Sequence, residues 1–286
     1  INPQASRTAT EAAMTTNLGS VQAHYASSDI ARRVLAAVGG ADAPTPDTLA
    51  PVDHFHGGGL ASTRELANLL APHRGERLLD LGSGIGGPAR WFAATFDCHV
   101  TGIDLTADYC RAAEALNVAT GLADKVRIVE GSALDLPFGD QNFDRAYSQN
   151  VVMNIADKPR FYREARRVLK PGGVLALSNL AAGPAGAPYY PVPWAASSDT
   201  SFLSTVAQTR EELQSAGLQI VYFEDTTAKT LQMRRAARLK LESEGLPPLG
   251  PHVFIGDRLR EYQINVSRSQ EEGRLSSIEV LALRPA

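Results

Sequence analysis

The sequence predicts an α/β protein whose core is a seven-stranded, mostly parallel sheet with helices on both faces. Three observations indicate this class. Short apolar runs of strand length alternate with helix-like runs between residues 77 and 180. A glycine cluster follows the first of these runs, in the stretch LLDLGSGIGGPARWF at 78–92. Two more strand-like runs lie at 219–225 and 277–283. Short strands that alternate with helices in this way form parallel sheets that are buried on both faces.

The N-terminal part is expected to be helical and to precede the sheet. Residues 18–39 suggest one or two short helices, and residues 39–51, GGADAPTPDTLAP, are expected to form a turn-rich linker. A further helix is expected over 60–71. We therefore divide the chain into an N-terminal helical lid and linker, 1–71, and a main domain, 72–286. We expect 18–60 to be held mainly by docking over a binding site, because it has few long apolar runs.

The main domain begins with five strands that alternate with helices. The strands are predicted at 77–82, 99–105, 126–131, 143–149 and 173–180, and the helices at about 87–95, 107–120 and 157–170. After residue 181 this alternation stops. Two insertions are expected, a loop rich in Pro, Gly and aromatic residues over about 182–206 and a helical segment over about 226–274. A helix at 208–216 and the strand at 219–225 lie between the two insertions. The second insertion is followed directly by the last strand, at 277–283.

Composition excludes several classes of partner. The chain is 44% apolar and 21% charged, with a net charge of −3, so no basic field favours nucleic acid or an anionic membrane. No apolar run reaches about 18 residues. Cys98 and Cys110 are too few for a disulfide framework. The first 17 residues lack the apolar core of a signal peptide, so we expect a cytoplasmic protein. The oligomeric state stays open, a homo-oligomer included.

The glycine cluster predicts a nucleotide-like ligand. Gly82-x-Gly84-x-x-Gly87 matches the dinucleotide-binding pattern and follows a predicted strand, as that pattern requires. Asp104 ends the second strand, 22 residues after Gly82, where a carboxylate can accept both hydroxyls of a ribose. The helix that begins near Pro88 offers free backbone N–H groups. These features indicate a Rossmann-like fold with an adenosine-bearing ligand across the strand ends. A purely structural turn is the alternative.

Further motifs narrow the choice of ligand. LLDLGSGIGGPARWFA, VTGIDLT, IVEGSALDLPF, NFDRAYSQNVVMNI and RVLKPGGVLALSN follow one another over about residues 75–182. Together they resemble the successive motifs of class I S-adenosylmethionine-dependent methyltransferases. VDHFHGGGLASTRELA upstream and PYYPVPWA downstream resemble the small-molecule group that includes sarcosine/dimethylglycine N-methyltransferases and natural-product methyltransferases. The resemblance implies a small-molecule methyl acceptor and a setting in specialised metabolism.

The resemblance also implies which residues contact the cofactor. They are Tyr25, Asp80, Gly82, Ser83, Gly84, Gly86, Asp104, Leu105, Ser132, Ala133 and Gln149. Asp104 would bind the ribose hydroxyls and Leu105 would lie against the adenine. Ser132 would edge the adenine amino group, at a position where many relatives carry Asp. Gln149 would sit beside the sulfonium, and Tyr25 would close over the cofactor. Packing on the core is an equal alternative for Tyr25.

Methyl transfer from a sulfonium needs alignment more than it needs a base. An amine need only be neutral at attack, whereas a hydroxyl or carbon acceptor needs a proton acceptor within reach. His54 and His56 are the candidate bases, and we expect His56 to wall the pocket. Their i, i+2 spacing, with no second cluster, falls short of metal-ligand spacing, so no metal is expected. Asn150 stands where many relatives have His, which favours an amine acceptor or chemistry that needs little help from a base.

The acceptor side is expected to come from outside the sheet. Tyr189, Tyr190 and Trp194 could form an aromatic wall, with Met153 and Asn154 as the floor and His54 nearby. Aromatic faces attract ammonium groups, but they suit flat or prenyl substrates equally well. Core packing is an equal alternative for the aromatic residues.

Three other functions stay open. An NAD-dependent oxidoreductase could use the same glycine pattern, although the middle of the chain has no Tyr-x-x-x-Lys pair. A non-catalytic protein could retain the S-adenosylmethionine pocket. A nucleic-acid or protein methyltransferase is disfavoured by the acidic net charge and by the absence of an Asn-Pro-Pro-Tyr-type motif.

Overall fold

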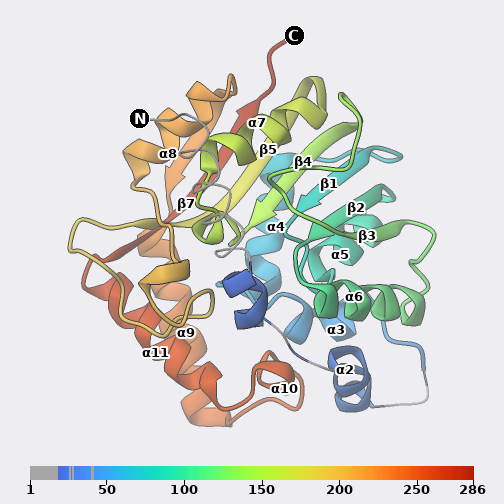
Figure 1. Ribbon diagram of the computed structural model, residues 1–286. Coiled ribbons are helices and arrows are strands. Elements are labelled where there is room, and N and C mark those ends of the chain that lie inside the picture. Colours follow the sequence, from blue (N-terminus) through green and yellow to red (C-terminus); the bar gives the residue numbers. More distant parts are fainter. Residues whose placement is uncertain (1–18, 26, 28, 40–41) are drawn as a thin grey trace.

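Seven strands form one twisted sheet with helices on both sides (Figure 1). The computed structural model describes residues 19–25, 27, 29–39 and 42–286. The strands are β1 (Arg77–Leu81), β2 (His99–Asp104), β3 (Val126–Glu130), β4 (Phe143–Gln149), β5 (Leu169–Ala182), β6 (Gln219–Asp225) and β7 (Leu275–Leu283). Their order is β3-β2-β1-β4-β5-β7-β6. β1 to β5 are parallel, and β7 runs antiparallel to both β5 and β6. The predicted mostly parallel seven-stranded sheet is confirmed.

The helices connect and extend this sheet. They are α2 (Ile30–Val38), α3 (Pro46–Asp53), α4 (Gly59–Leu70), α5 (Gly87–Phe96), α6 (Ala107–Ala119), α7 (Lys158–Val168), α8 (Val206–Ser215), α9 (Thr227–Glu244), α10 (His252–Ile255) and α11 (Arg258–Glu271). Residues 19–25 are also helical. Single 3₁₀ turns lie at Val152–Asn154 and Ser198–Thr200. The helical insertion expected before the last strand is present as α9, α10 and α11. In the part of the chain that the structure describes, no helix has the length and apolar character needed to cross a membrane.

Two predicted boundaries were wrong for physical reasons. The linker expected over 39–51 contains α3, which begins at Pro46 because Thr45 and Thr48 form a capping box and proline suits the first helical turn. The strand expected at 173–180 begins earlier, at Leu169, because its first residue pairs with the start of β4. The expectation for the first 17 residues concerns a segment outside the described residues.

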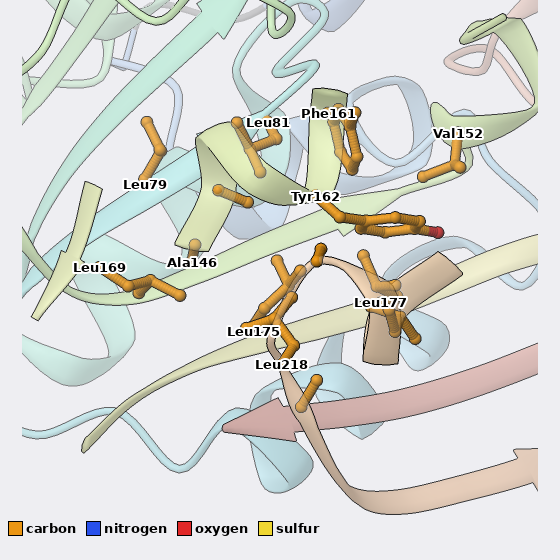
Figure 2. Close-up of a cluster of buried hydrophobic side chains, with 14 of the residues drawn as sticks. Leu79, Leu81, Ala146, Val152, Phe161, Tyr162, Leu169, Leu175, Leu177 and Leu218 are labelled. Carbon is orange, nitrogen blue, oxygen red and sulfur yellow. The ribbon is translucent and has the colours of Figure 1, made fainter. Parts of the chain in front are cut away.

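The core divides into one apolar layer on each face of the sheet. Leu79 and Leu81 point to the face covered by α7, where they cluster with Phe161 and Tyr162 (Figure 2). Leu78 points to the opposite face and packs with side chains of α4 and α5. This alternation along β1 follows the period of two that a strand imposes. With both faces covered, the sheet holds the carboxyl ends of its parallel strands at one edge, where the site lies.

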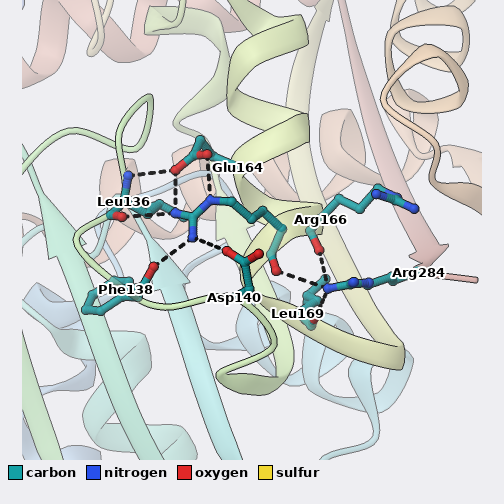
Figure 3. A network of polar contacts seen from close by, with 8 residues as sticks. Leu136, Phe138, Asp140, Glu164, Arg166, Leu169 and Arg284 are labelled. Atoms are coloured by element: carbon teal, nitrogen blue, oxygen red, sulfur yellow. Dashed lines mark hydrogen bonds and ion pairs between the residues drawn. The ribbon is translucent and has the colours of Figure 1, made fainter. Parts of the chain in front are cut away.

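The segment between β3 and β4 is tied to α7 by a charged network (Figure 3). The Arg167 guanidinium donates to two carboxylates and two backbone carbonyls, those of Glu164, Asp140, Leu136 and Phe138. Glu164 in turn accepts the backbone N–H of Leu136 at 2.9 Å. Arg284 donates to carbonyls at the end of α7, which a cation there stabilises. The network holds the segment whose first residues, Ser132 and Ala133, reach the site.

Candidate active site

A cavity of about 430 Å³ opens at the carboxyl ends of β1, β2 and β4. The chain runs from β1 outward to β2 and β3 and then returns to β4 on the other side of β1. Such a reversal of strand order leaves a crevice where α/β proteins bind ligands. Residues 19–25, the segment after α3, and α10 and α11 complete the walls.

The glycine loop forms the floor of the cavity beside β1. Gly82 and Gly84 have φ angles of 82° and 53°, which side chains rarely tolerate. A Cβ on Gly84 would lie 3.3 Å from the Phe55 ring, and one on Gly82 would lie 2.3 Å from Val151. Gly86 is the N-cap of α5, with a φ of 79°, and is not among the residues that line the cavity. The cofactor contact expected for Gly86 stays a prediction.

Asp104 lies at the end of β2 with its carboxylate fixed by the backbone. Its Oδ2 accepts the N–H of Gly84 at 2.8 Å, and its Oδ1 accepts the N–H of Thr106 at 2.9 Å. Burial raises the pKa of Asp104, while the backbone donors act in the opposite direction. Each carboxylate oxygen has a second acceptor position. Asp104 lines the cavity and can accept hydroxyl donors there.

Five buried polar atoms around the cavity have no hydrogen-bond partner among the described residues. They are Asp80 Oδ2, Ser83 Oγ, Gln149 Nε2, His54 Nε2 and Arg234 Nε, and all five residues line the cavity. Buried polar atoms are almost always paired in folded proteins. Burial also raises the pKa of Asp80 to about 8. A ring of unpaired donors and acceptors around one cavity fits a polar ligand that supplies the missing bonds.

Thr63, on α4, connects the histidines to Gln149. Its hydroxyl donates to Gln149 Oε1 at 3.1 Å and lies 2.9 Å from His54 Nδ1 and 3.2 Å from His56 Nε2. A hydroxyl has one proton, so His54 Nδ1 must then donate to Thr63 Oγ1. This tautomer leaves the unpartnered His54 Nε2 as an acceptor. His56 has its Nδ1 3.4 Å from the Gly57 carbonyl, so in the neutral form it can donate either to that carbonyl or to Thr63. Thr63 was not among the predicted site residues, and its one signal is that it is a polar residue on the apolar face of α4, with Leu66 and Leu70.

Both imidazoles are held in the neutral form. Burial lowers the pKa of His54 to about 3, and the neighbouring His56 contributes in the same direction. Burial lowers the pKa of His56 to about 4. The two rings therefore present hydrogen-bonding groups without adding positive charge beside the cavity.

Residues 19–25 cross the mouth of the cavity and touch both of its sides. Gln22 Nε2 donates to the carbonyl of Leu105 at 2.9 Å, next to Asp104. On the other side, the Tyr25 hydroxyl donates to Asn154 Oδ1 at 3.0 Å, and His24 Nε2 donates to the Pro193 carbonyl at 3.0 Å. Tyr25, as expected for a residue that closes over a ligand, lines the cavity.

Most of the other predicted residues meet at this cavity. Leu105, Ser132, Ala133, Met153, Asn154, Trp194 and His56 line it together with the residues named above. Tyr189 and Tyr190 do not. The hydroxyl of Tyr189 donates to Glu272 at 2.6 Å, and its ring faces the guanidinium groups of Arg268 and Arg274 at 4.0 and 4.5 Å. These contacts bind Tyr189 to α11 and the turn after it, outside the cavity.

The cavity has further lining residues that the sequence did not indicate. Phe254 of α10 and Tyr262 of α11 line it, together with Leu180 from β5 and Arg234 from α9. Phe55, between the two histidines, also lines the cavity and packs against Phe254 with a centroid separation of 5.2 Å. The helical character of the sequence predicts these helices, but it does not indicate which face of each helix lines the cavity.

Comparisons with known proteins agree with this geometry. Residues 79–177 match the model of a methyltransferase domain. A phosphoethanolamine N-methyltransferase of Triticum aestivum is 33% identical over 69% of this chain and 39% of its own length. A glycine/sarcosine/dimethylglycine N-methyltransferase of Actinopolyspora halophila is 34% identical over 52% of this chain and 26% of its own length. The chain thus spans well under half of these curated relatives.

Solved structures share the fold. Phosphoethanolamine N-methyltransferase 2 of Haemonchus contortus, in complex with S-adenosyl-L-methionine, superposes with a TM-score of 0.70 over 82% of this chain and 54% of its own, at 21% identity. The [4+2]-cyclase SpnF superposes with a TM-score of 0.66 over 87% of this chain and all of its own, at 23% identity. At these identities the likeness concerns the fold.

Proposed function

We propose that the chain is an S-adenosylmethionine-dependent methyltransferase and that it transfers a methyl group to a small-molecule amine. One observation carries the proposal. The unpaired atoms of Asp80, Ser83 and Gln149 surround the same cavity as the glycine loop and Asp104. The fold alone would not decide the reaction, because one fold serves many chemistries and a [4+2]-cyclase shares this one.

The residues present fit the cofactor. In our proposal Asp104 accepts the ribose hydroxyls on its two free acceptor positions, and Asp80 accepts from the ammonium of the methionine part. Glycine is required at 84 because a Cβ there would press on the Phe55 ring and the φ of 53° is one that side chains rarely adopt. S-adenosylmethionine supplies a methyl group on a positively charged sulfur, which makes a good leaving group.

An amine acceptor is supported by the character of the two histidines. With pKa values lowered to about 3 and 4, His54 and His56 are weak bases. A hydroxyl acceptor would need a stronger proton acceptor than either. His54 Nε2 can instead accept a hydrogen bond from an amine N–H and orient its lone pair. The two relatives reported above carry N-methyltransferase names, which agrees with this choice.

The chain's own contribution is then alignment and exclusion of water. Thr63 fixes both imidazoles and Gln149, and residues 19–25 cover the mouth. Orientation of this kind can lower a barrier by about 7–11 kcal/mol in favourable cases. No strong base is needed for that contribution.

Two measurements test the proposal. Calorimetric titration with S-adenosylmethionine, its demethylated product and NAD should show binding of the first two and none of NAD. Methyl-labelled S-adenosylmethionine should then transfer label to members of a small-amine panel. Binding of NAD in place of S-adenosylmethionine would establish the oxidoreductase alternative. Cofactor binding with no transfer to amine, hydroxyl or carbon acceptors would establish the non-catalytic one.

A further inference from the structure

Arg234, on α9, is the exception in a helix of paired charges. α9 carries five basic side chains, and four of them have an acidic partner: Lys229 with Glu65, Arg235 with Glu271, Arg238 with Glu242, and Lys240 with Glu244. No ion pair or hydrogen bond to Arg234 occurs among the described residues, and its Nε is buried without a partner. The unpaired side chain is the one of the five that lines the cavity.

The guanidinium of Arg234 lies beside the segment that carries His54 and His56. Its Nη2 lies 2.6 Å from the point that a Cβ on Gly57 would occupy, so glycine at 57 makes room for the guanidinium. Gly57 directly follows His56. Arg258 also lines the cavity, at its exposed rim. These are the two lysine or arginine side chains among the lining residues that the structure describes.

The acidic groups nearby do not neutralise Arg234. Asp53 is paired with Arg90 at 2.6 Å, and Glu65 is paired with Lys229. Glu279 lines a small adjoining pocket together with Arg234 but does not come within ion-pair distance of it. Burial lowers the pKa of Arg234 to about 10, so the group stays charged at neutral pH.

Arg234 is a half-buried cation whose Nε is shielded from solvent and has no partner among the described residues. Removing part of a cation from water without a counter-ion is unfavourable, and a bound anion offsets that cost. Arg90 has such a counter-ion in the same molecule, because its guanidinium is fully buried and bonded to both oxygens of Asp53. Arg234 has no comparable partner in the part of the chain that the structure describes, and it lines a cavity that can admit one.

We infer that the methyl acceptor carries an oxyanion, a carboxylate or a phosphate monoester, which pairs with Arg234. The inference rests on the proposed function and names the class of its acceptor. A guanidinium matches either group through two parallel N–H···O bonds. Bound there, the anion lies next to the His54–His56 segment and leaves the amine for the cofactor side. The acceptor is thus an amine with an anionic group.

The first test needs no identified substrate. Melting temperatures of wild type, Arg234→Gln and Arg235→Gln are compared in chloride, acetate and phosphate at equal ionic strength, with the demethylated cofactor product bound. We expect acetate or phosphate to raise the melting temperature of wild type and of Arg235→Gln, and not that of Arg234→Gln. The two anions separate a carboxylate site from a phosphate site. No anion-specific rise in wild type would overturn the inference.

The same variants separate a ligand site from a structural one. Because Arg234 is unpaired, Arg234→Gln should melt at the same temperature as wild type in chloride, or higher. A clear fall would mean that Arg234 stabilises the fold, through Glu279 and water for example, and would contradict the inference. Glu279→Gln is the matched control and should leave the anion effect unchanged.

Catalysis gives the second test. Label transfer is compared between phosphoethanolamine and ethanolamine, and between sarcosine and sarcosinamide, which differ in the anion. We expect wild type to prefer the anionic member of one pair and Arg234→Gln to lose that preference, with KM for the anionic member raised roughly tenfold to a hundredfold. An equal preference in Arg234→Gln would overturn the inference. Affinity for S-adenosylmethionine, measured separately, should be the same in wild type and in Arg234→Gln. If wild type does not bind S-adenosylmethionine at all, the proposed function fails and not this inference alone.

Discussion

The two ends of the N-terminal region are held in place by different means. α3 buries Leu49 and Val52 completely, and its last residue, Asp53, forms an ion pair with Arg90 in which both side chains are at most 1% exposed. A Cβ on Gly87 would lie only 2.4 Å from the Asp53 carbonyl oxygen, so α3 and α5 touch through their backbones. Residues 19–25 bury only Val21 of their apolar side chains and are held by a few side-chain hydrogen bonds.

The comparison divides the predicted lid into a fixed wall and a cover. We use wall for residues 46–57 and cover for residues 19–25. The expectation that 18–60 depends mainly on docking over the binding site does not describe the wall, which has its own core contacts and a buried ion pair. It remains a prediction for the cover, whose side-chain hydrogen bonds from Gln22, His24 and Tyr25 reach across the cavity and whose aromatic rings contact Tyr109 and Tyr262.

The largest effect is expected from a substitution that removes the buried ion pair of the wall. Asp53→Asn leaves the Arg90 guanidinium buried without a counter-charge, and the loss of one partner of such a pair costs about 3–5 kcal/mol of the free energy of unfolding. Urea denaturation measures it. The double variant Asp53→Asn/Arg90→Met removes both charges and should recover part of the loss. A single variant that loses less than about 1 kcal/mol would mean that the ion pair does not hold the wall.

The next effect separates cofactor binding from the wall. Asp104→Ala should weaken S-adenosylmethionine binding by about 1.5–3 kcal/mol, because a charged acceptor of two hydroxyls is lost. Calorimetry gives the affinity, and Asp135→Ala, at an exposed site, is the control. In wild type, amide exchange should slow in 19–25 when the cofactor binds and change little in α3. Equal slowing in both segments would contradict the division.

A third test concerns the hydroxyl that connects the wall to β4. Thr63→Val keeps the shape of the side chain but frees Gln149 and both imidazoles, so we expect turnover at saturation to fall on the order of tenfold, the equivalent of one hydrogen bond. Cofactor affinity should be kept. Thr63→Ser, which restores the hydroxyl, should recover turnover. Failure of that rescue would show that Thr63 acts through packing.

Acid sensitivity should also arise in the wall. The pKa values of His54 and His56 in the folded protein, about 3 and 4, lie below the ordinary value of about 6.5, so the unfolded chain binds protons first. Stability from these groups is present above about pH 6.5 and is lost as pH falls towards 4, by at most about 1.4 kcal/mol per group and pH unit. His54→Gln should reduce this dependence in urea denaturation at pH 7, 6 and 5. The exposed His99→Gln should not.

Asp80 acts in the opposite direction. Its pKa is raised to about 8, so its contribution to stability is complete below about pH 4 and is lost as pH rises to 8. The histidine test therefore compares the free energy of unfolding of wild type with that of His54→Gln at each pH, because the contribution of Asp80 is common to both proteins. An unchanged difference between His54→Gln and wild type from pH 7 to 5 would contradict it.

The smallest expected effect sharpens the description of the cover. Tyr25→Phe removes the hydrogen bond to Asn154 Oδ1 and should cost about 0.5–1.5 kcal/mol. We expect the loss to appear as faster amide exchange in 19–25, with the melting temperature nearly unchanged. Gln22→Ala, which cuts the bond to the other side of the cavity, is the companion variant. A large fall in melting temperature in either variant would make the cover part of the core.

The sheet and its cofactor edge were predictable because strand ends fix positions. β4 and β6 have the predicted bounds, and Asp80, Asp104 and Gln149 meet because parallel strands end at one edge. Arg234 was not predictable, because it depends on which face of a long polar helix packs inward. α9 buries no residue completely, so its sequence has no apolar stripe to indicate that face.

The linker shows a second limit. The composition of 39–51 is typical of a turn, and local residues at Thr45 and Thr48 still start a helix there. What holds that helix is Arg90, which lies 37 positions beyond Asp53 and whose burial only the packed fold determines. The prediction that Tyr189 lines the cavity was not met for a related reason, because a long loop can place an aromatic ring on either side of itself.

The cover bonds to both sides of the cavity, and this geometry has a thermodynamic consequence. Gln22 bonds to the Leu105 carbonyl on the side that we propose for the cofactor, while His24 and Tyr25 bond to Pro193 and Asn154 on the side that we propose for the acceptor. A ligand on either side that orders this one short helix has already met the entropic cost that the second ligand would otherwise meet. Cofactor and acceptor are then coupled, and linkage requires the factor to be the same in both directions.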